Sequence, residues 1–317
     1  MKQAFQNLSD YMNQQIIGQP DLVSNMMIAL LAEGHILVEG PPGLAKTRAI
    51  KALSDGIEGD FQRIQFTPDL LPADLTGSEI YRPEDGSFKF QAGPLFHPLI
   101  LADEINRAPA KVQSALLEAM AEQQITVAGK TYPLPELFMV MATQNPIEQE
   151  GTYPLPEAQL DRFLMHLELD YPSAETEQKI LQLNRAEAKQ EAAMQISPMP
   201  IATLFDARQE TLNLHLSEAV ERYMVELIIA TRQPKKYSAD LASWLEYGVS
   251  PRATISLERC ARAHAWLCNQ EFVTPDNVQA VFANVMRHRL LLSYKAEAAG
   301  ISAENVITEI LNKVPAP

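Results

Sequence analysis

The sequence predicts an α/β protein, in which a parallel sheet flanked by helices is followed by a smaller domain made only of helices. Strand-like and helix-like stretches alternate through the first half of the chain, as they do in a doubly wound sheet. Residues 98–103 (PLILAD) and 137–143 (LFMVMAT) are almost continuously apolar, which is typical of buried parallel strands. After Pro172 the chain is rich in Ala, Glu, Leu and Arg and shows no convincing strand. We therefore expect an α/β domain at 1–190 and a helical domain at 191–317.

The elements of the α/β domain follow from local pattern. An amphipathic helix is expected at 20–33, because its apolar residues lie mostly on one side, and a second helix is expected at 109–122. In the helical domain, Thr274-Pro275-Asp276 combines a capping residue, a first-turn proline and an acid, which indicates a helix start. The expected strands are 35–39, 61–66, 98–103, 137–143 and 164–169.

Two stretches interrupt the alternation of strands and helices. Residues 80–90 have the pattern of a β-hairpin whose turn lies at Asp85-Gly86, and residues 124–132 have the pattern of a second hairpin. Each hairpin is either surface decoration or a working loop, and local pattern alone leaves both interpretations open.

Composition excludes several classes of protein. The formal net charge of the 317 residues is −14 and the pI is about 4.9, which argues against general affinity for nucleic acid. The two cysteines, Cys260 and Cys268, are too far apart on a helix to form a disulfide, which suits a reducing compartment. We find neither a signal-peptide pattern nor an apolar run long enough to span a membrane. We therefore expect a cytoplasmic protein.

The octapeptide GPPGLAKT, residues 40–47, lies between an expected strand and a helix-forming stretch. A glycine-rich turn in this context binds phosphate through backbone N–H groups at the helix start. Lys46 can reach the outer phosphates of a nucleotide, and the Thr47 hydroxyl can bind Mg²⁺. Ala45 stands where the phosphate-loop pattern has glycine, and its β-carbon is compatible with a helical backbone. The alternative is an ordinary turn between strand and helix.

Polar side chains also follow two other expected strands. Asp103 and Glu104 end the strand at 98–103, where one carboxylate can hold the Mg²⁺ shell and the other can orient or deprotonate water. The simpler alternative is a pair of solvated acids. Asn145 follows the strand at 137–143, in the position of a crevice residue that can hold water or the γ-phosphate. A lone Asn before Pro is otherwise a common turn residue.

Two arginines complete the set of candidate residues. Arg162 follows a short helix, and an arginine offered by a neighbouring subunit can stabilise charge on a transferred phosphoryl group. An ion pair with Asp161 is the alternative role. Arg252 opens a helix of the second domain and could reach a nucleotide, or have no role beyond the helix start.

Together, these motifs resemble those of an AAA+ ATPase. GPPGLAKT, LILADEINRAPAKVQ, ATQNP, LPEAQLDRF and SPRA resemble its phosphate loop, acidic strand, first sensor, arginine finger and second sensor, in the family's order. The closest resemblance is to the MoxR family, in which Ala commonly precedes the phosphate-loop Lys, as Ala45 does here. This family belongs to a clade shared with magnesium chelatase subunits and MCM-type helicases.

The resemblance implies a fold, a site and an assembly. It implies an AAA+ core with inserted hairpins and a helical lid, acting as a ring that is expected to be hexameric. It gives Glu104, Asn145, Arg162 and Arg252 catalytic roles, with Arg252 acting either in cis or in trans. Thr47 and Asp103 would hold Mg²⁺. The residues implied to contact ATP or ADP are Ile17, Gly18, Pro42, Gly43, Leu44, Ala45, Lys46, Thr47 and Arg48.

The leading hypothesis from the sequence is a Mg²⁺-dependent ATPase that remodels or activates a partner protein. The resemblance suggests a partner with a von Willebrand A domain. A nucleotide-gated adaptor with little hydrolysis is the first alternative, although a mere binder needs no water-orienting acid. A DNA-associated motor is a weaker alternative, because the chain is strongly acidic.

Overall fold

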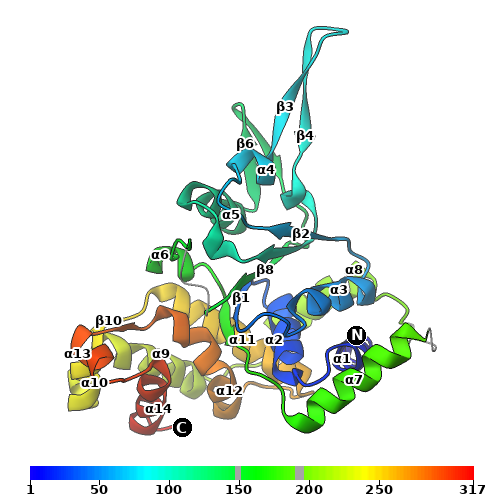
Figure 1. Cartoon of the computed structure of the whole chain (residues 1–317). Coiled ribbons are helices and arrows are strands. Elements are labelled where there is room, and N and C mark those ends of the chain that lie inside the picture. Colours follow the sequence, from blue (N-terminus) through cyan, green and yellow to red (C-terminus); the bar gives the residue numbers. More distant parts are fainter. Residues whose placement is uncertain (147–150, 190–195) are drawn as a thin grey trace.

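The computed structural model describes residues 1–146, 151–189 and 196–317, so the expected domain boundary at 190/191 lies outside the described residues. Its centre is a five-stranded parallel sheet with the order β2-β5-β8-β1-β9 (Figure 1). The strands are β1 (Ile36–Glu39), β2 (Phe61–Gln65), β5 (Leu99–Asp103), β8 (Met139–Gln144) and β9 (Met165–Glu168). Each expected strand is therefore present.

The strand register aligns the ends of the central strands. Glu39 at the end of β1 pairs with Gln144 of β8, and Ala102 of β5 pairs with Ala142 of β8. Because all the pairs are parallel, the segments that follow β1, β5 and β8 emerge along one border of the sheet, which we call the carboxyl edge. The segments that enter β1 and β9 lie along the opposite border, the amino edge.

Alternating strand residues feed two apolar clusters, one on each face of the sheet. Val38, Leu101 and Met141 belong to the cluster that includes the helices α1, α2 and α3, whereas Leu37 and Ile100 belong to the cluster of α5. The helices of this half are α1 (Lys2–Gln15), α2 (Pro20–Leu31), α3 (Lys46–Gly56), α4 (Pro72–Thr76), α5 (Ala110–Glu122), α6 (Glu157–Leu160) and α7 (Ala174–Ala188).

The described residues 196–317 are mostly helical, and we call this region the lid. Its helices are α8 (Ile201–Leu212), α9 (Glu218–Arg232), α10 (Ala239–Trp244), α11 (Pro251–Leu267), α12 (Pro275–Met286), α13 (Tyr294–Ala298) and α14 (Ala303–Lys313). The expected start at Thr274 is confirmed, because its side chain caps α12. The sequence predicts no strand here, but β10 (Leu245–Tyr247) and β11 (Leu291–Leu292) form one short antiparallel pair. Such short segments carry too little periodic pattern to be recognised in a sequence.

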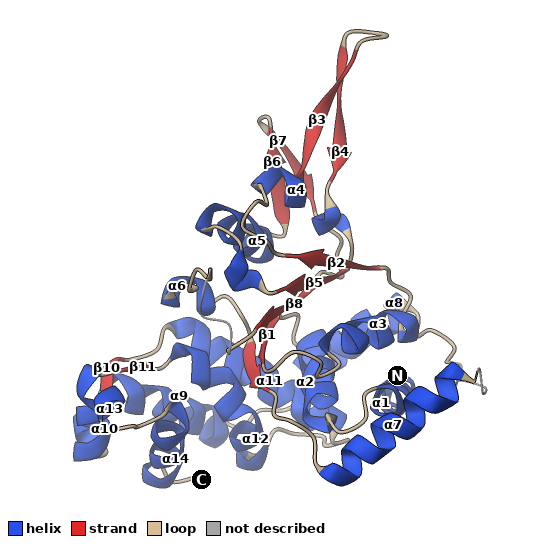
Figure 2. Ribbon diagram, viewed as in Figure 1, coloured by secondary structure: helices blue, strands red, loops and turns tan. Residues whose placement is uncertain are grey.

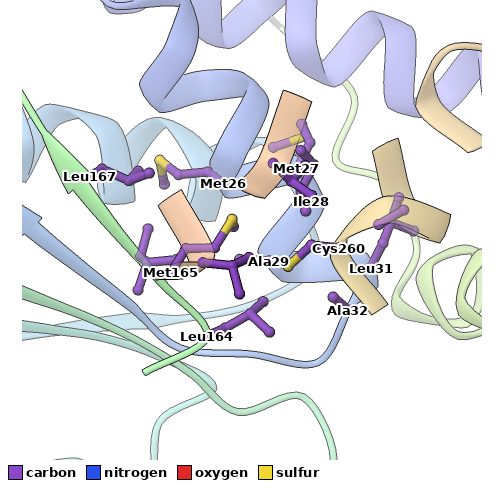
Figure 3. Close-up of a cluster of buried hydrophobic side chains, with 14 of the residues drawn as sticks. Met26, Met27, Ile28, Ala29, Leu31, Ala32, Leu164, Met165, Leu167 and Cys260 are labelled. Atoms are coloured by element: carbon purple, nitrogen blue, oxygen red, sulfur yellow. The ribbon is translucent and has the colours of Figure 1, made fainter. Parts of the chain in front are cut away.

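One apolar cluster joins the sheet to the lid through α2. Figure 3 shows Met26 and Ile28 of α2 among Met165 and Leu167 of β9 and Cys260 of α11, and all these side chains are buried. Burial raises the pKa of the Cys260 thiol to about 12, so this side chain behaves as an apolar packing group. The lid is therefore packed against the sheet through continuous apolar contact.

Both expected hairpins are present and project from the same end of the molecule (Figure 2). They are formed by β3 (Gly77–Arg82) with β4 (Ser87–Ala92), and by β6 (Gln124–Val127) with β7 (Lys130–Pro133). Phe90 of β4 stacks on Tyr132 of β7, with ring centroids 4.1 Å apart and planes inclined by 15°. This contact ties the two hairpins together, while the pair Tyr81 and Phe88 stays exposed farther out.

Replacement of Met26 by Ala tests the joint between sheet and lid. Met26 is fully buried, so we expect M26A to lower the free energy of unfolding by about 2–5 kcal/mol in urea denaturation. The exposed Val225 of α9 provides a control, since V225A removes apolar atoms that already meet water. A cost for M26A no larger than that of V225A would contradict the packing described here.

Candidate active site

The phosphate loop connects β1 to α3 at the carboxyl edge. Lys46, the first residue of α3, donates a hydrogen bond from Nζ to the Gly40 carbonyl oxygen at 2.7 Å, so its side chain folds back across the loop. Gly43 has φ of +85° and open space on the side where a β-carbon would stand. Burial lowers the pKa of Lys46, although Asp103 and Glu104 act in the opposite direction. An anion bound in this loop would favour the charged ammonium.

Ala45 adopts the left-handed conformation, with φ of 57° and ψ of 19°. The helical backbone expected at Ala45 from the sequence is therefore wrong, although the loop does hold an alanine at this position. A left-handed alanine costs about 1–2 kcal/mol relative to the right-handed form. The flanking strand and helix, both anchored in the core, therefore hold this loop in shape.

Asp103 is held on both of its carboxylate oxygens. Oδ1 accepts a hydrogen bond from the Thr143 hydroxyl at 2.6 Å, and Oδ2 accepts one from Arg63 Nη2 at 2.7 Å. Thr143 in turn accepts the backbone N–H of Glu104 at 2.9 Å and is almost fully buried. The Thr143 hydroxyl therefore fixes both acids at once. Sequence reasoning missed these two partners, because they become neighbours of Asp103 only through the strand order.

Glu104 also has a left-handed backbone, with φ of 57° and ψ of 51°. Its Oε2 accepts a hydrogen bond from Gln65 at 2.9 Å and pairs with Arg107 at 3.1 Å. A non-glycine residue held in this conformation next to a phosphate loop marks a candidate functional position.

Asn145 completes the carboxyl edge. It follows β8, is buried, and lines a cavity of about 320 Å³ together with Glu39, Gln144 and Asn106. The residues that follow β1, β5 and β8 thus come together as the sequence predicted, and the order β5-β8-β1 brings Asn145 between the acids and the phosphate loop.

A second cavity of about 330 Å³ lies beside the phosphate loop and has mostly apolar walls. Of the predicted nucleotide contacts, the lining includes Ile17, Pro42, Gly43, Leu44, Ala45 and Arg48. Gly18 is close by, but it packs on α7, where a β-carbon would come within 2.1 Å of Thr176. Sequence reasoning missed the outer wall, which consists of Tyr171, Pro172 and the α7 residues Ile180 and Leu183.

Arg48 connects this cavity to its surrounding helices. Its guanidinium donates hydrogen bonds to Gln15 of α1 and to Glu187 of α7. The bond from Arg48 lowers the pKa of the Glu187 carboxyl. The α7 wall is thus tied to the helix that begins at the phosphate loop.

The donors at the carboxyl edge suit Mg²⁺ in the presence of a nucleotide. Among the described residues, no group of three or more His, Cys, Asp or Glu side chains could hold a metal ion alone. Thr47 and Asp103 instead offer one hydroxyl and one carboxylate. Mg²⁺ typically takes only one or two oxygen ligands from the protein and completes its coordination with substrate phosphates and water. The side chains present therefore fit a magnesium–nucleotide complex.

The two predicted arginines lie elsewhere, at the amino edge. Arg162 precedes β9 and donates to the Leu117 carbonyl oxygen at 2.5 Å, while Arg252 lies exposed in the first turn of α11. Both line a cavity of about 300 Å³ that also includes Arg259 and Arg289. The fold thus brings the arginines next to each other, and neither lines the cavity beside the phosphate loop.

Comparison with known proteins agrees with this geometry. The model of the ATPase family associated with various cellular activities (AAA) matches residues 35–165, and that of the AAA lid domain matches residues 240–310. The fold and the site are those of an AAA+ ATPase with a helical lid. Chaperone MoxR1 of Mycobacterium tuberculosis is 45% identical over 95% of this chain and 79% of its own length. The chain belongs to the MoxR family of AAA+ ATPases.

Two further relatives support this assignment. Protein MoxR of Paracoccus denitrificans is 34% identical, over 91% of this chain and 89% of its own. The crystal structure of a protein from Cytophaga hutchinsonii, described as a candidate ATPase, superposes with a TM-score of 0.92 and 44% identity, covering 100% of this chain and 96% of that one.

Thr143 offers a test of how the acids are held. T143V keeps the shape of the side chain but removes the hydroxyl that bridges Asp103 and Glu104, whereas T143S keeps the hydroxyl. We expect T143V to lose about 1.5–3 kcal/mol of stability in urea denaturation, because a hydrogen bond to a charged group is lost. T143S serves as the matched control and should lose clearly less. Equal losses in both variants would assign the effect to packing.

Proposed function

We propose that this protein binds and hydrolyses ATP at the carboxyl edge of its sheet and works as a ring of identical subunits. The observation that carries the proposal is the placement of Lys46, Asp103, Glu104 and Asn145 at one edge of the sheet. An apolar cavity of about 330 Å³ lies beside the phosphate loop at that edge. That volume and lining suit a nucleotide base, with its phosphates directed along the loop toward Lys46.

Each side chain has a role in this proposal. Lys46 binds the β- and γ-phosphates, and Thr47 and Asp103 hold Mg²⁺, which neutralises charge on the phosphates when bound. Glu104 orients the attacking water and accepts its proton, and Asn145 holds that water or the γ-phosphate. Ile17 and Leu44 pack against the base from one side, and the α7 residue Ile180 packs from the other.

Substitution of Lys46 and Glu104 tests the catalytic assignment. We expect K46A to lose nucleotide binding and E104Q to retain it, since only the latter leaves the phosphate contacts intact. Both should lower the rate of ATP hydrolysis by about 10²-fold or more. Turnover is measured by phosphate release, and binding by the rise in Tm with added ADP.

The control for these variants is E118Q, which neutralises an exposed acid on α5. Unchanged turnover in both K46A and E104Q would refute the assignment. A wild-type protein that binds ATP tightly without measurable turnover would instead support the adaptor alternative.

The proposed ring follows from the position of the two arginines. The four residues of β1 span about 13 Å, so the amino edge is far from the phosphates bound at the carboxyl edge of the same subunit. The cavity beside the phosphate loop is lined by residues 15–19, 42–48 and 171–184, with none from the matched lid. We therefore infer that Arg162 and Arg252 both act on the nucleotide of a neighbouring subunit, in a closed ring that we take to be a hexamer.

Mixed rings test this action in trans. A ring of R162A subunits and a ring of E104Q subunits should each be inactive, but they lack different halves of the site. Random mixing at equal amounts should restore up to about a quarter of wild-type turnover, because that fraction of interfaces combines two intact halves in a cyclic assembly. R252A should behave in the same way if it also acts in trans.

Two controls accompany the mixing experiment. Mixing K46A with E104Q should restore nothing, since both variants damage the same half of the site. Absence of recovery for R162A at every mixing ratio would contradict the trans arrangement.

The cellular role is proposed from relatives and from surface features. A relative that is 45% identical is named a chaperone, so we propose that ATP turnover remodels or activates a client protein, for which a von Willebrand A domain is our candidate. Tyr81 and Phe88 form an exposed aromatic pair on the β3/β4 hairpin, which contacts the second hairpin through Phe90 and Tyr132. This pair is a suitable contact surface for a client. Among the described residues, no helix could cross a membrane. We propose a cytoplasmic location and a domain division at 190/191.

A further inference from the structure

Asp161, the residue before Arg162, links the two arginine-bearing segments. Its Oδ2 accepts a hydrogen bond from the Ser250 hydroxyl at 2.7 Å. Ser250 is the N-cap of α11, and its oxygen accepts the backbone N–H of Arg252 at 3.1 Å. A chain of two hydrogen bonds therefore runs from the neighbour of Arg162 to the backbone of Arg252.

A buried arginine holds the other oxygen of the same carboxylate. Arg289 donates from Nε to Asp161 Oδ1 at 2.9 Å, and only 2% of its side chain is exposed. Its Nη2 donates to the Phe163 carbonyl oxygen at 2.5 Å and to Ser256 of α11 at 3.2 Å. Arg289 is thus hydrogen-bonded both to the backbone just after Arg162 and to Ser256 of α11.

The charges around the cavity that Arg162 and Arg252 share make Asp161 essential to the arrangement of these arginines. Arg162, Arg252, Arg259 and Arg289 all line one cavity. Burial lowers the pKa of the Arg289 guanidinium, the Asp161 carboxylate raises it, and the positive charge of Arg252 lowers it further. Among the described residues, the acids in that lining are Glu33 and Asp161, and Glu33 is already paired with Arg208 at 3.0 Å. Without Asp161, the buried guanidinium of Arg289 would lose its carboxylate partner, and an unpaired buried charge is strongly destabilising.

We propose that Asp161 is a positioning residue that holds Arg162 and Arg252 in one fixed arrangement, so that both meet the nucleotide of the next subunit together. The inference rests on the proposed action of these arginines in trans. Asp161 touches no substrate in this arrangement. It acts through Ser250 and Arg289, which hold Arg162 and Arg252 in place relative to each other. The positive charge of these two arginines then faces the nucleotide of the next subunit.

The test uses D161N in the full-length ring. Asparagine keeps an acceptor for Ser250 but loses the charge that balances Arg289. Because misplacement of about 1 Å can cost 10²-fold in rate, we expect turnover of the D161N ring to fall about 10- to 100-fold. Its affinity for ADP should match that of wild type, since the phosphate loop is at the other edge. Mixing D161N with E104Q should restore activity, as we expect for R162A.

Two matched controls separate positioning from general damage to the lid. E304Q removes a carboxylate partner, 2.6 Å away, from Arg287, which lies in the same short turn as Arg289, and should leave turnover unchanged. S250A should slow turnover more than S217A, because both remove an N-cap serine of a lid helix but only Ser250 contacts Asp161. This serine pair provides the test if D161N does not fold.

Wild-type turnover in D161N, or equal effects of S250A and S217A, would overturn the proposal. Recovery of R162A but not of a folded D161N in mixed rings would also overturn it, while leaving the trans assignment intact. If neither recovers, the proposed action of the arginines in trans fails and this inference fails with it, whereas the ATPase assignment is tested separately by K46A and E104Q. Loss of turnover in D161N with unchanged ADP affinity and recovery on mixing would support it.

Discussion

Parallel pairing of β5, β8 and β1 is the constraint on which the rest of this molecule depends. Because the three strands run in the same direction and in register, the segments that follow them emerge at one edge. The phosphate loop, the two acids and Asn145 thereby become neighbours, although up to 105 positions separate Gly40 from Asn145 in the chain. The Thr143 hydroxyl donates a hydrogen bond to Asp103 and accepts one from the Glu104 backbone N–H. The register of β5 and β8 therefore fixes the positions of both acids.

The same constraint separates the arginines from the phosphate loop. Segments that enter β9 must lie at the opposite edge, where Arg162 meets the start of α11 and Arg252. This chain has a net charge of −14, yet four arginines line one of its cavities. Among the described residues of that lining, the acids are Glu33 and Asp161, and Asp161 pairs with Arg289. This arrangement is explained most simply by an anion supplied from outside the subunit, and it is the physical basis for our proposal of a site shared between copies.

The buried core of this protein stabilises backbone conformations at the site that are unfavourable on their own. Ala45 and Glu104 both have left-handed backbones, each of which costs about 1–2 kcal/mol relative to the usual conformation. The strands and helices beside them are anchored in buried apolar clusters, and one of these clusters continues through α2 into the lid. The core therefore positions the loops of the candidate site and also joins them to α11.

The sequence by itself determined the elements and the chemistry of the carboxyl edge. Alternating strand-like and helix-like stretches predicted each strand of the parallel sheet, and the residue types of Lys46, Thr47, Asp103 and Glu104 indicated phosphate and magnesium binding, because these signals are local. Only the tertiary structure decided that Arg63, Thr143 and the α7 wall join the site, that Ala45 is left-handed, and that β10 pairs with β11. It also decided which edge Arg252 faces. These facts depend on strand order and on contacts between distant segments, such as Asp161 with Ser250 and Arg289, and no local pattern in a chain encodes them.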